Sequence, residues 1–161
     1  MTVDVKIERC RDSAIIPTYA NSGDAGMDVY AAEEVVIKPG ETILVPIGIK
    51  FAIPVGYEIE VRPRSGLSLN TPLRIPNSPG TIDSGYRGEF FIPVNNSSTY
   101  GEEDIYNITE KGNKKGTYVI HQGERVAQIL LKEVPVINFV QVDDVSETGG
   151  NRGGGFGSTG V

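Results

Sequence analysis

The run TILVPIGIKFAI, residues 42–53, is rich in Val and Ile, and its apolar residues do not follow a helical period. Six further runs of this kind lie between clusters of Gly, Pro, Asn and Asp: VDVKIER, EEVVIKP, YEIEVRP, EFFIPVNN, TYVIHQ and ERVAQILLKEV. Short β-branched runs between turn-forming residues are typical of an all-β chain. With 20 Gly and 10 Pro spread along 161 residues, the sequence predicts one domain, built as a β-sandwich, jelly roll or small barrel.

The charge and the cysteine count restrict the possible partners. Acidic residues number 21 against 15 basic ones, so the net charge is −6 and nucleic acid is a poor candidate partner. A polyanionic ligand would need a local group of Arg or Lys side chains, or a metal ion. The single Cys10 excludes an intrachain disulfide and a Cys-rich metal site. The start MTVDVKIERC lacks an apolar signal region and no apolar run reaches transmembrane length, so we expect a soluble, cytoplasmic protein without membrane contact.

Two segments interrupt the strand pattern. Residues 97–116, SSTYGEEDIYNITEKGNKKG, are polar and long for a connection between strands, and we expect a surface excursion, most simply a mobile loop. From residue 147 the chain reads ETGGNRGGGFGSTGV, which contains too much Gly for a core strand and is typical of a flexible tail. The predicted division is a β domain over residues 1–146 and a Gly-rich arm over residues 147–161.

The stretch GTIDSGYRGE, residues 80–89, places Asp83 between an apolar residue and a tight turn. With the residues IPNSP before it, this stretch predicts a β-hairpin with Asp83 at its tip. A turn-forming Asp is the simpler interpretation of an isolated D-S-G, and a carboxylate that accepts a proton is the functional one. The lone His121 has no second His and no Ser or Cys nucleophile motif near it, so we interpret it as structural.

Three other motifs contain polar side chains that suit a ligand. In RPRSGLS, residues 62–68, a guanidinium, a hydroxyl and an open backbone N–H stand together and suit an anion, although surface loops often carry such a tripeptide. In GDAGMDVYA, residues 23–31, Asp28 heads an alternating strand and either caps a turn or orients a basic side chain or a metal-bound water. In GERVAQILL, residues 123–131, Gln128 interrupts an apolar run, so its amide either bonds to backbone or faces a polar site.

The tail contains GFGSTG, residues 155–160, which formally matches G-x-G-x-x-G. A dinucleotide site needs a strand before this motif and a helix after it, so that interpretation fails here. An inert spacer does not need Arg152, Phe156, Ser158 and Thr159, which add charge, a stacking ring and hydroxyls to glycines that let backbone N–H groups approach phosphate. The tail is therefore either a spacer or an arm that closes over a nucleotide.

Taken in order, these motifs resemble those of the trimeric deoxyuridine triphosphate nucleotidohydrolases, the dUTPases. The five matching segments are AGMDVYAA (25–32), RPRSGLS (62–68), NSPGTIDSGYRGE (77–89), GERVAQILL (123–131) and RGGGFGSTG (152–160). They span nearly the whole chain, and their set and order are far more specific than any one motif. The resemblance implies a β jelly roll that forms a homotrimer with active sites shared among the subunits. It also implies hydrolysis of dUTP to dUMP and pyrophosphate with Mg²⁺, which limits uracil in DNA and supplies dUMP for thymidylate synthesis.

For the nucleoside, the resemblance assigns roles around residue 83. Asp83 matches the catalytic acid, which would orient and deprotonate a water that attacks the α-phosphorus. Tyr86 would stack beneath the deoxyribose and leave no room for a 2′-hydroxyl. The backbone of this segment and the Asn77 amide would read uracil, and a site that satisfies the uracil edge penalises cytosine. The pocket would also be lined by Thr81, Ile82 and Phe91.

For the phosphates, the resemblance assigns Arg64, Ser65 and Gly66 to a phosphate-binding corner and Gln128 to a contact with the triphosphate. Asp28 would organise nearby Arg side chains and the water shell of Mg²⁺. Asp28 and Gln128 would thus reach the metal only through water, and the triphosphate would hold the ion itself.

The tail would be a lid over the active site of a neighbouring subunit. Phe156 would stack on uracil, which helps to order the triphosphate and exclude bulk water. The β- and γ-phosphates would be held by Arg152, Gly157, Ser158 and Thr159.

Two features depart from the family's pattern, and two alternative functions stay open. The 97–116 excursion is longer than expected, and Pro72 stands where the family often has Gly. A dCTP deaminase, or a bifunctional deaminase and dUTPase, has the same fold but usually carries R-S-S-L-A where this chain has PRSGLS. A non-catalytic β-sandwich that binds a partner through residues 97–116 is the alternative from another class. Turnover of dUTP and release of ammonia from dCTP separate these functions.

Overall fold

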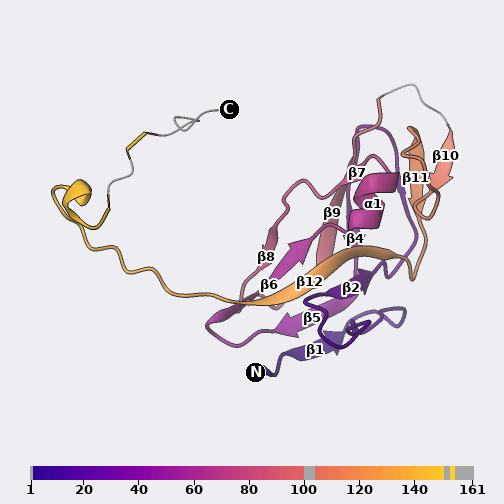
Figure 1. Cartoon of the computed structure of the whole chain (residues 1–161). Coiled ribbons are helices and arrows are strands. Elements are labelled where there is room, and N and C mark those ends of the chain that lie inside the picture. Colours follow the sequence, from indigo (N-terminus) through magenta and orange to yellow (C-terminus); the bar gives the residue numbers. More distant parts are fainter. Residues whose placement is uncertain (1, 100–103, 151–152, 155–161) are drawn as a thin grey trace.

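The computed structural model describes residues 2–99, 104–150 and 153–154, and these residues form four small β-sheets (Figure 1). The largest sheet has the order β2 (Met27–Tyr30), β12 (Arg125–Glu133), β6 (Tyr57–Arg62) and β8 (Gly80–Ile82). Two three-stranded sheets have the orders β4 (Thr42–Pro46), β9 (Phe91–Asn96), β7 (Leu73–Arg74) and β10 (Ile105–Asn107), β11 (Thr117–Ile120), β3 (Val35–Ile37). The remaining pair is β1 (Lys6–Arg9) with β5 (Ile49–Ala52). The predicted all-β jelly roll is confirmed.

Alternating side chains along the strands build one shared core. In β9, Ile92, Val94 and Asn96 are buried, whereas the residues between them are only half-buried. The inward-facing side chains of the separate sheets join in a single cluster dominated by Ile and Val. Because one core holds all four sheets, the loops at the strand ends are fixed to a common frame.

The run TILVPIGIKFAI, predicted as one strand, forms two. β4 ends at Pro46 and β5 begins at Ile49. Gly48, between them, has a φ of +75°, a conformation that favours glycine, and a Cβ atom added there would lie 2.9 Å from the Ala14 Cβ. The break at Gly48 allows β4 to pair with β9 while β5 pairs with β1, so this run contributes to two sheets.

The RPRSGLS segment, which no sequence pattern marked as helical, enters a short helix, α1 (Ser65–Asn70). The Asn70 amide donates a hydrogen bond to the Gly66 carbonyl over 2.9 Å, and the Thr71 hydroxyl donates to the Leu67 carbonyl over 2.7 Å. The buried Leu67 side chain anchors the helix to the core. A helix of six residues is too short to show a helical period in the sequence. The strands β7, β8 and β10 have only two or three residues each and are likewise too short to show an alternating pattern in the sequence.

The 97–116 excursion is more ordered than a simple loop where the structure describes it. Its β10 strand pairs in parallel with β11, and Ile108 is buried against the core. The backbone N–H of Asn113 donates to the Asn70 carbonyl over 2.8 Å, which ties the excursion to the end of α1. A polar composition predicted the surface position, whereas the long-range strand pairing leaves no local signal.

Beyond β12 the chain leaves the body of the domain (Figure 1). Residues 134–150 are all exposed, and the segment contains the short 3-10 helix η1 (Val145–Glu147). Within residues 2–99, 104–150 and 153–154, no helix is long and apolar enough to cross a membrane.

Asn96 is a fully buried polar residue that joins three parts of the fold. Its amide nitrogen donates to the carbonyls of Ile37 (2.9 Å) and Gly116 (2.8 Å), and its amide oxygen accepts from the Ser98 N–H (3.0 Å). The side chain therefore connects β9 to β3 and to the base of the excursion. Each of these backbone groups would be costly to leave buried without a partner.

Replacement of Asn96 by Ala should destabilise the fold by about 3 kcal/mol, because three buried backbone groups lose their partner. Asn95→Ala is the matched control, since the neighbouring Asn95 is half-buried, and we expect it to cost less than about 1 kcal/mol. Denaturant unfolding of both variants measures the difference. Equal losses would show that Asn96 does not hold the sheets together.

Candidate active site

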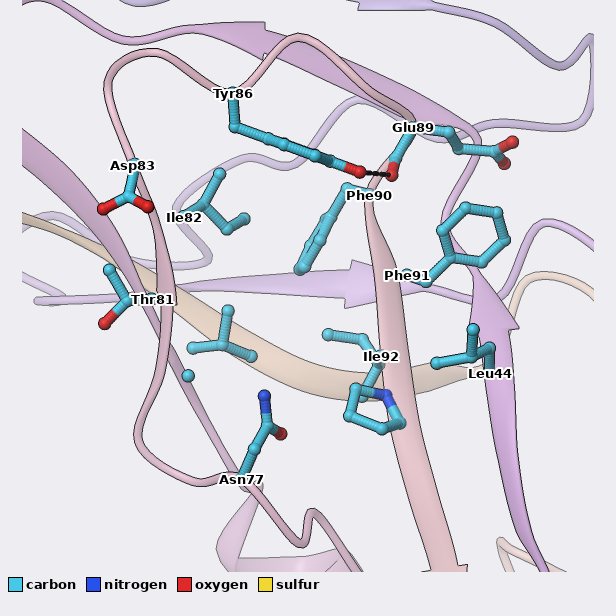
Figure 2. A pocket seen from close by; sticks show the side chains of 13 residues that line it. Leu44, Asn77, Thr81, Ile82, Asp83, Tyr86, Glu89, Phe90, Phe91 and Ile92 are labelled. Atoms are coloured by element: carbon cyan, nitrogen blue, oxygen red, sulfur yellow. Dashed lines mark hydrogen bonds between the residues drawn. The ribbon is translucent and has the colours of Figure 1, made fainter.

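A pocket of about 340 Å³ opens between β8 and β9 (Figure 2). Its lining includes Val61 from β6 and Leu44 from β4, so two different sheets form its walls. Of the residues that the resemblance assigned to the nucleoside, the lining includes all that the structure describes, namely Asn77, Thr81, Ile82, Asp83, Tyr86 and Phe91, whereas Phe156 lies outside the described residues. Residues that are separated in the sequence are thus gathered around one space, and their roles toward a ligand stay predictions.

The predicted β-hairpin around Asp83 is wrong. β8 pairs with β6 and β9 pairs with β4, so the two arms of the supposed hairpin belong to different sheets. Each arm is captured by a partner strand from elsewhere in the chain, and the 83–90 connection crosses from one sheet to the other. This crossing holds the arms apart and opens the pocket.

The turn at Asp83 is present and fixes the position of Tyr86. The Tyr86 N–H donates to the Asp83 carbonyl over 3.0 Å, and the Tyr86 hydroxyl donates to the Glu89 carbonyl over 2.8 Å. A Cβ atom at Gly88 would lie 2.5 Å from the Tyr86 hydroxyl oxygen, so the ring lies directly against the glycine backbone. The Tyr86 side chain is 46% exposed and forms one side of the pocket, near the Asp83 carboxylate (Figure 2).

The Asn77 side chain lines the pocket beside Gly80. A Cβ atom at Gly80 would lie 3.4 Å from the Asn77 amide nitrogen and 3.3 Å from the Val61 Cβ. The Asn77 amide lies at the end of the pocket opposite Tyr86 (Figure 2). An amide at this position offers both a donor and an acceptor to a planar polar ligand.

A second polar group surrounds Asp28 in β2. The Asp28 carboxylate accepts hydrogen bonds from the Arg64 Nε (2.8 Å), the Gln128 amide nitrogen (3.3 Å) and the Arg125 Nη1 (3.4 Å). The carboxylate is 14% exposed, so the three donors almost enclose it. The structure therefore brings together the predicted residues Asp28, Arg64 and Gln128, and Asp28 orients basic side chains as expected. We call these residues with Arg125 the Asp28 cluster.

Arg125 was not predicted as a member of this cluster. Positions 125 and 128 should face opposite sides of a regular strand, because side chains alternate with a period of two. The pairing register of β12 with β2 shifts between Arg125 and Ala127, and this bulge brings Arg125 to the side of Asp28. The only signal in the sequence is an Arg close before the unusual polar residue Gln128.

Ser65 and Gly66 begin α1, immediately after Arg64. Arg64 and Gly66 line a second hollow of about 430 Å³ together with Arg125. Lys111 from the 97–116 excursion also lines this hollow. Three cationic side chains, two of them paired with Asp28, thus face a space beside the predicted phosphate corner.

The Asp28 cluster and the Asp83 pocket lie apart on this chain. Asp28 is in β2 and Asp83 follows β8, and these strands occupy opposite edges of the four-stranded sheet. Gln128 pairs with Asp28 and with Arg62, whereas Ile82 pairs with Ile59 farther along β6. With a strand spacing of about 4.8 Å and a rise of about 3.3 Å per residue, the backbone positions of Asp28 and Asp83 lie about 20 Å apart across this sheet.

The described part of the chain contains no group of three or more His, Cys, Asp or Glu side chains that could hold a metal ion. Asp28 is the carboxylate beside the predicted phosphate corner, and its oxygens already accept bonds from Arg64, Arg125 and Gln128. This donor set fits a Mg²⁺ ion that is carried by a triphosphate and reached through water. The predicted lid residues lie outside the described residues: Arg152, Phe156, Gly157, Ser158 and Thr159.

Comparison with known proteins gives a consistent result. The family model for dUTPase matches residues 12–160. A deoxyuridine 5'-triphosphate nucleotidohydrolase from Clostridioides difficile is 42% identical over 158 residues, which cover 98% of both chains. The protein of the same name from Helicobacter pylori strain J99 is 40% identical and covers 98% of this chain and 97% of its own.

Solved structures agree with the sequence comparisons. The dUTPase of Staphylococcus bacteriophage 80alpha with dUPNHPP has a TM-score of 0.87 at 32% identity and covers 99% of this chain and 100% of its own. A mutant dUTPase from phage phi11 of S. aureus, which coordinates a structural Mg(II) ion, has a TM-score of 0.79 at 28% identity and covers 88% of this chain and 98% of its own.

Replacement of Gly88 by Ala should displace the Tyr86 ring, because the added methyl group would lie 2.5 Å from the Tyr86 hydroxyl oxygen. We expect loss of the hydrogen bond to the Glu89 carbonyl in a crystal structure of the variant. Gly85→Ala is the control, since a Cβ atom there meets nothing within 4 Å. If the ring keeps its place in Gly88→Ala, close contact with the glycine backbone does not set its position.

Proposed function

This chain belongs to the dUTPase family, and we propose that it hydrolyses dUTP to dUMP and pyrophosphate by attack of a water molecule on the α-phosphorus. The reaction would limit uracil in DNA, supply dUMP for thymidylate synthesis and take place in the cytoplasm. The observation that carries the proposal is the pocket that gathers Asn77, Asp83 and Tyr86. These residues offer an amide for a base, a carboxylate for a water and an aromatic ring for a sugar.

Asp83 acts as the general base in this proposal. The residue directly follows β8, and its own carbonyl accepts the Tyr86 N–H, so its backbone is fixed at both ends of the turn. An ionised carboxylate within hydrogen-bond reach of a water can both orient it and accept its proton. A fixed carboxylate also places the water on one side of the reacting phosphorus, as in-line displacement requires.

The remaining pocket residues select the nucleoside. Asn77 and the backbone of β8 read the uracil edge, and Thr81, Ile82 and Phe91 close the space around the base. The Tyr86 ring, held against Gly88, forms the floor beneath the deoxyribose and excludes a 2′-hydroxyl. This arrangement predicts rejection of cytosine, thymine and ribose nucleotides by the same pocket.

The Asp28 cluster binds the phosphates. Arg64, Ser65 and Gly66 supply a guanidinium, a hydroxyl and a backbone N–H to the α- and β-phosphates, and Gln128 adds an amide. Asp28 holds the Arg64 fork in place over 2.8 Å. When Mg²⁺ is bound, it neutralises charge on the triphosphate, and Asp28 and Gln128 orient its water shell. The Gly-rich arm, which the family model includes, closes as a lid through Arg152, Phe156, Gly157, Ser158 and Thr159.

The separation of the two groups supports an active site shared between subunits. Asp83 and the Asp28 cluster lie about 20 Å apart on one chain, too far to act on the same phosphate group. A second copy of the chain can place its Asp28 cluster next to the Asp83 pocket of the first copy. In a closed ring of three copies, the same contact forms three times and gives three complete sites. The segment between β12 and the Gly-rich arm exposes Val136 (93%), Ile137 (72%) and Phe139 (90%), as expected for a segment that packs on another subunit.

The first test of this function is the release of pyrophosphate from dUTP with Mg²⁺, measured beside UTP, dTTP and dCTP. Asp83→Asn should lower kcat by at least about 100-fold, because the general base is lost. Asp4→Asn is the control, since Asp4 is exposed and distant in sequence from every motif, and it should keep full activity. Release of ammonia from dCTP would instead support a deaminase, and turnover by Asp83→Asn at the wild-type rate would exclude Asp83 as the base.

A second test removes the arm. Truncation after Glu147 should leave the oligomer assembled, because the exposed apolar segment before it is retained, and should lower dUTP turnover at least about tenfold. Sedimentation and steady-state kinetics of the truncated chain measure the two effects. Full activity would refute the lid assignment.

A further inference from the structure

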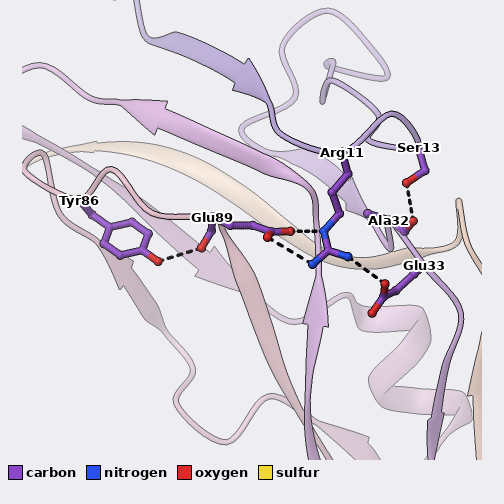
Figure 3. A network of polar contacts seen from close by, with 6 residues as sticks. All are labelled: Arg11, Ser13, Ala32, Glu33, Tyr86 and Glu89. Atoms are coloured by element: carbon purple, nitrogen blue, oxygen red, sulfur yellow. Dashed lines mark hydrogen bonds and ion pairs between the residues drawn. The ribbon is translucent and has the colours of Figure 1, made fainter.

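The Arg11 side chain lies between two carboxylates at the edge of the nucleoside pocket (Figure 3). Its Nε donates to the Glu89 Oε1 over 2.5 Å, and its Nη2 donates to the Glu89 Oε2 over 3.3 Å. Its Nη1 donates to the Glu33 Oε2 over 2.8 Å. The planar guanidinium therefore holds Glu89 with two bonds and Glu33 with a third, a geometry that a lysine ammonium cannot reproduce.

The backbone of Arg11 is itself fixed. The Cys10 N–H donates to the Gly48 carbonyl over 2.8 Å, and the Arg11 carbonyl accepts the Ala14 N–H over 3.1 Å. The turn packs closely on Gly48, where a Cβ atom would lie 3.1 Å from the Arg11 Cβ. The neighbouring Ser13 hydroxyl donates to the Ala32 carbonyl over 2.6 Å, which ties the turn to the segment after β2 (Figure 3).

Glu89 connects this fixed arginine to the pocket. Its carboxylate binds Arg11, and its backbone carbonyl accepts the Tyr86 hydroxyl over 2.8 Å. The next residue, Phe90, is anchored by backbone hydrogen bonds to Ile47 and Ile49. The Glu89 carboxylate is thus held by Arg11, and the Glu89 backbone is held through Phe90 by the sheets. The Tyr86 hydroxyl bonds to this fixed backbone.

We propose that Arg11 is a positioning residue for Tyr86 and thereby sets the discrimination between deoxyribose and ribose nucleotides. The inference rests on the proposed function, in which the Tyr86 ring is the floor beneath the sugar. Arg11 fixes the Glu89 carboxylate, the Glu89 carbonyl fixes the Tyr86 hydroxyl, and the ring cannot tilt to admit a 2′-hydroxyl. Arg11 touches neither sugar nor phosphate in this account.

Arg11 also neutralises a charge that would oppose the substrate. Glu89 lines the pocket, and an unpaired carboxylate there would repel a triphosphate. The hydrogen bond that Arg11 donates to Glu89 raises the pKa of the Arg11 guanidinium above its ordinary value, so Arg11 keeps its positive charge beside this carboxylate at neutral pH. Loss of Arg11 therefore predicts weaker binding of dUTP as well as poorer discrimination of the sugar.

The test is Arg11→Met, which keeps an unbranched apolar stem over Gly48 and removes all the hydrogen bonds of the guanidinium. We expect the ratio of kcat/KM for dUTP to that for UTP to fall by about tenfold, because the sugar floor becomes mobile. Arg11→Lys keeps the charge and should lose less of this ratio. Arg9→Met is the matched control: Arg9 is exposed in β1, and the ratio should not change.

Tyr86→Phe separates positioning from a general loss of stability. This variant lacks the hydroxyl that binds the Glu89 carbonyl, so adding Arg11→Met to it should lower the dUTP to UTP ratio no further. The KM for dUTP should still rise when Arg11→Met is added, because the Glu89 carboxylate loses its arginine partner in the wild type and in Tyr86→Phe alike. A full additional loss of the ratio in the double variant would overturn the route through Tyr86.

Hydrogen exchange gives a readout that does not depend on turnover. Peptides covering residues 83–89 should exchange faster in Arg11→Met than in Arg9→Met, both as full-length chains. If the wild type hydrolyses no dUTP, the proposed function fails. The exchange experiment still tests the positioning role in that case, because unchanged exchange of residues 83–89 in Arg11→Met would overturn it. In an active enzyme, an unchanged dUTP to UTP ratio in folded Arg11→Met overturns the proposal.

Discussion

The sheet order β2-β12-β6-β8 places Asp28 and Asp83 at opposite edges of one sheet, and the proposed chemistry depends on that separation. Neither carboxylate can be moved toward the other without breaking the β12–β6 pairing, which is the longest ladder of this sheet. A chain built in this way holds the two halves of a nucleotide site rigidly and keeps them apart. Under the proposed function, assembly of copies then becomes a requirement for catalysis, and the exposed apolar segment between β12 and the Gly-rich arm offers a surface for that assembly.

Local charge balance explains how a chain of net charge −6 can act on a polyanion. Asp28 is enclosed by Arg64, Arg125 and Gln128, and Glu89 is covered by Arg11, so one carboxylate near each half of the site is paired with arginine. Each pair also fixes a donor that the proposed function assigns to the substrate, or a ring that shapes the pocket. Asp28 and Glu89 thus orient basic and aromatic groups, in contrast to Asp83, the proposed general base.

Much of the fold and the site could be predicted from the sequence. Alternating Val and Ile runs predicted the all-β class, and the ordered motifs predicted that Asp28, Arg64 and Gln128 meet and that Asn77, Asp83 and Tyr86 share a pocket. Some misses were local, such as the short helix α1 and the break at Gly48, and the others were set by more distant parts of the chain. The supposed hairpin is split because β6 and β4 capture its arms, Arg125 turns toward Asp28 at a bulge, and the partner of Glu89 lies 78 residues away.

The central claim, that the active site forms between copies, is tested most directly by complementation. Asp83→Asn and Arg64→Gln chains, each inactive alone, are co-expressed with different tags, and oligomers that carry both tags are purified. In a ring of three with each site made from two neighbours, every mixed ring contains one intact site, so activity should be about one third of the wild-type value. Activity no higher than that of the parent variants would contradict the account, because it would place Asp83 and Arg64 of the same chain in one site.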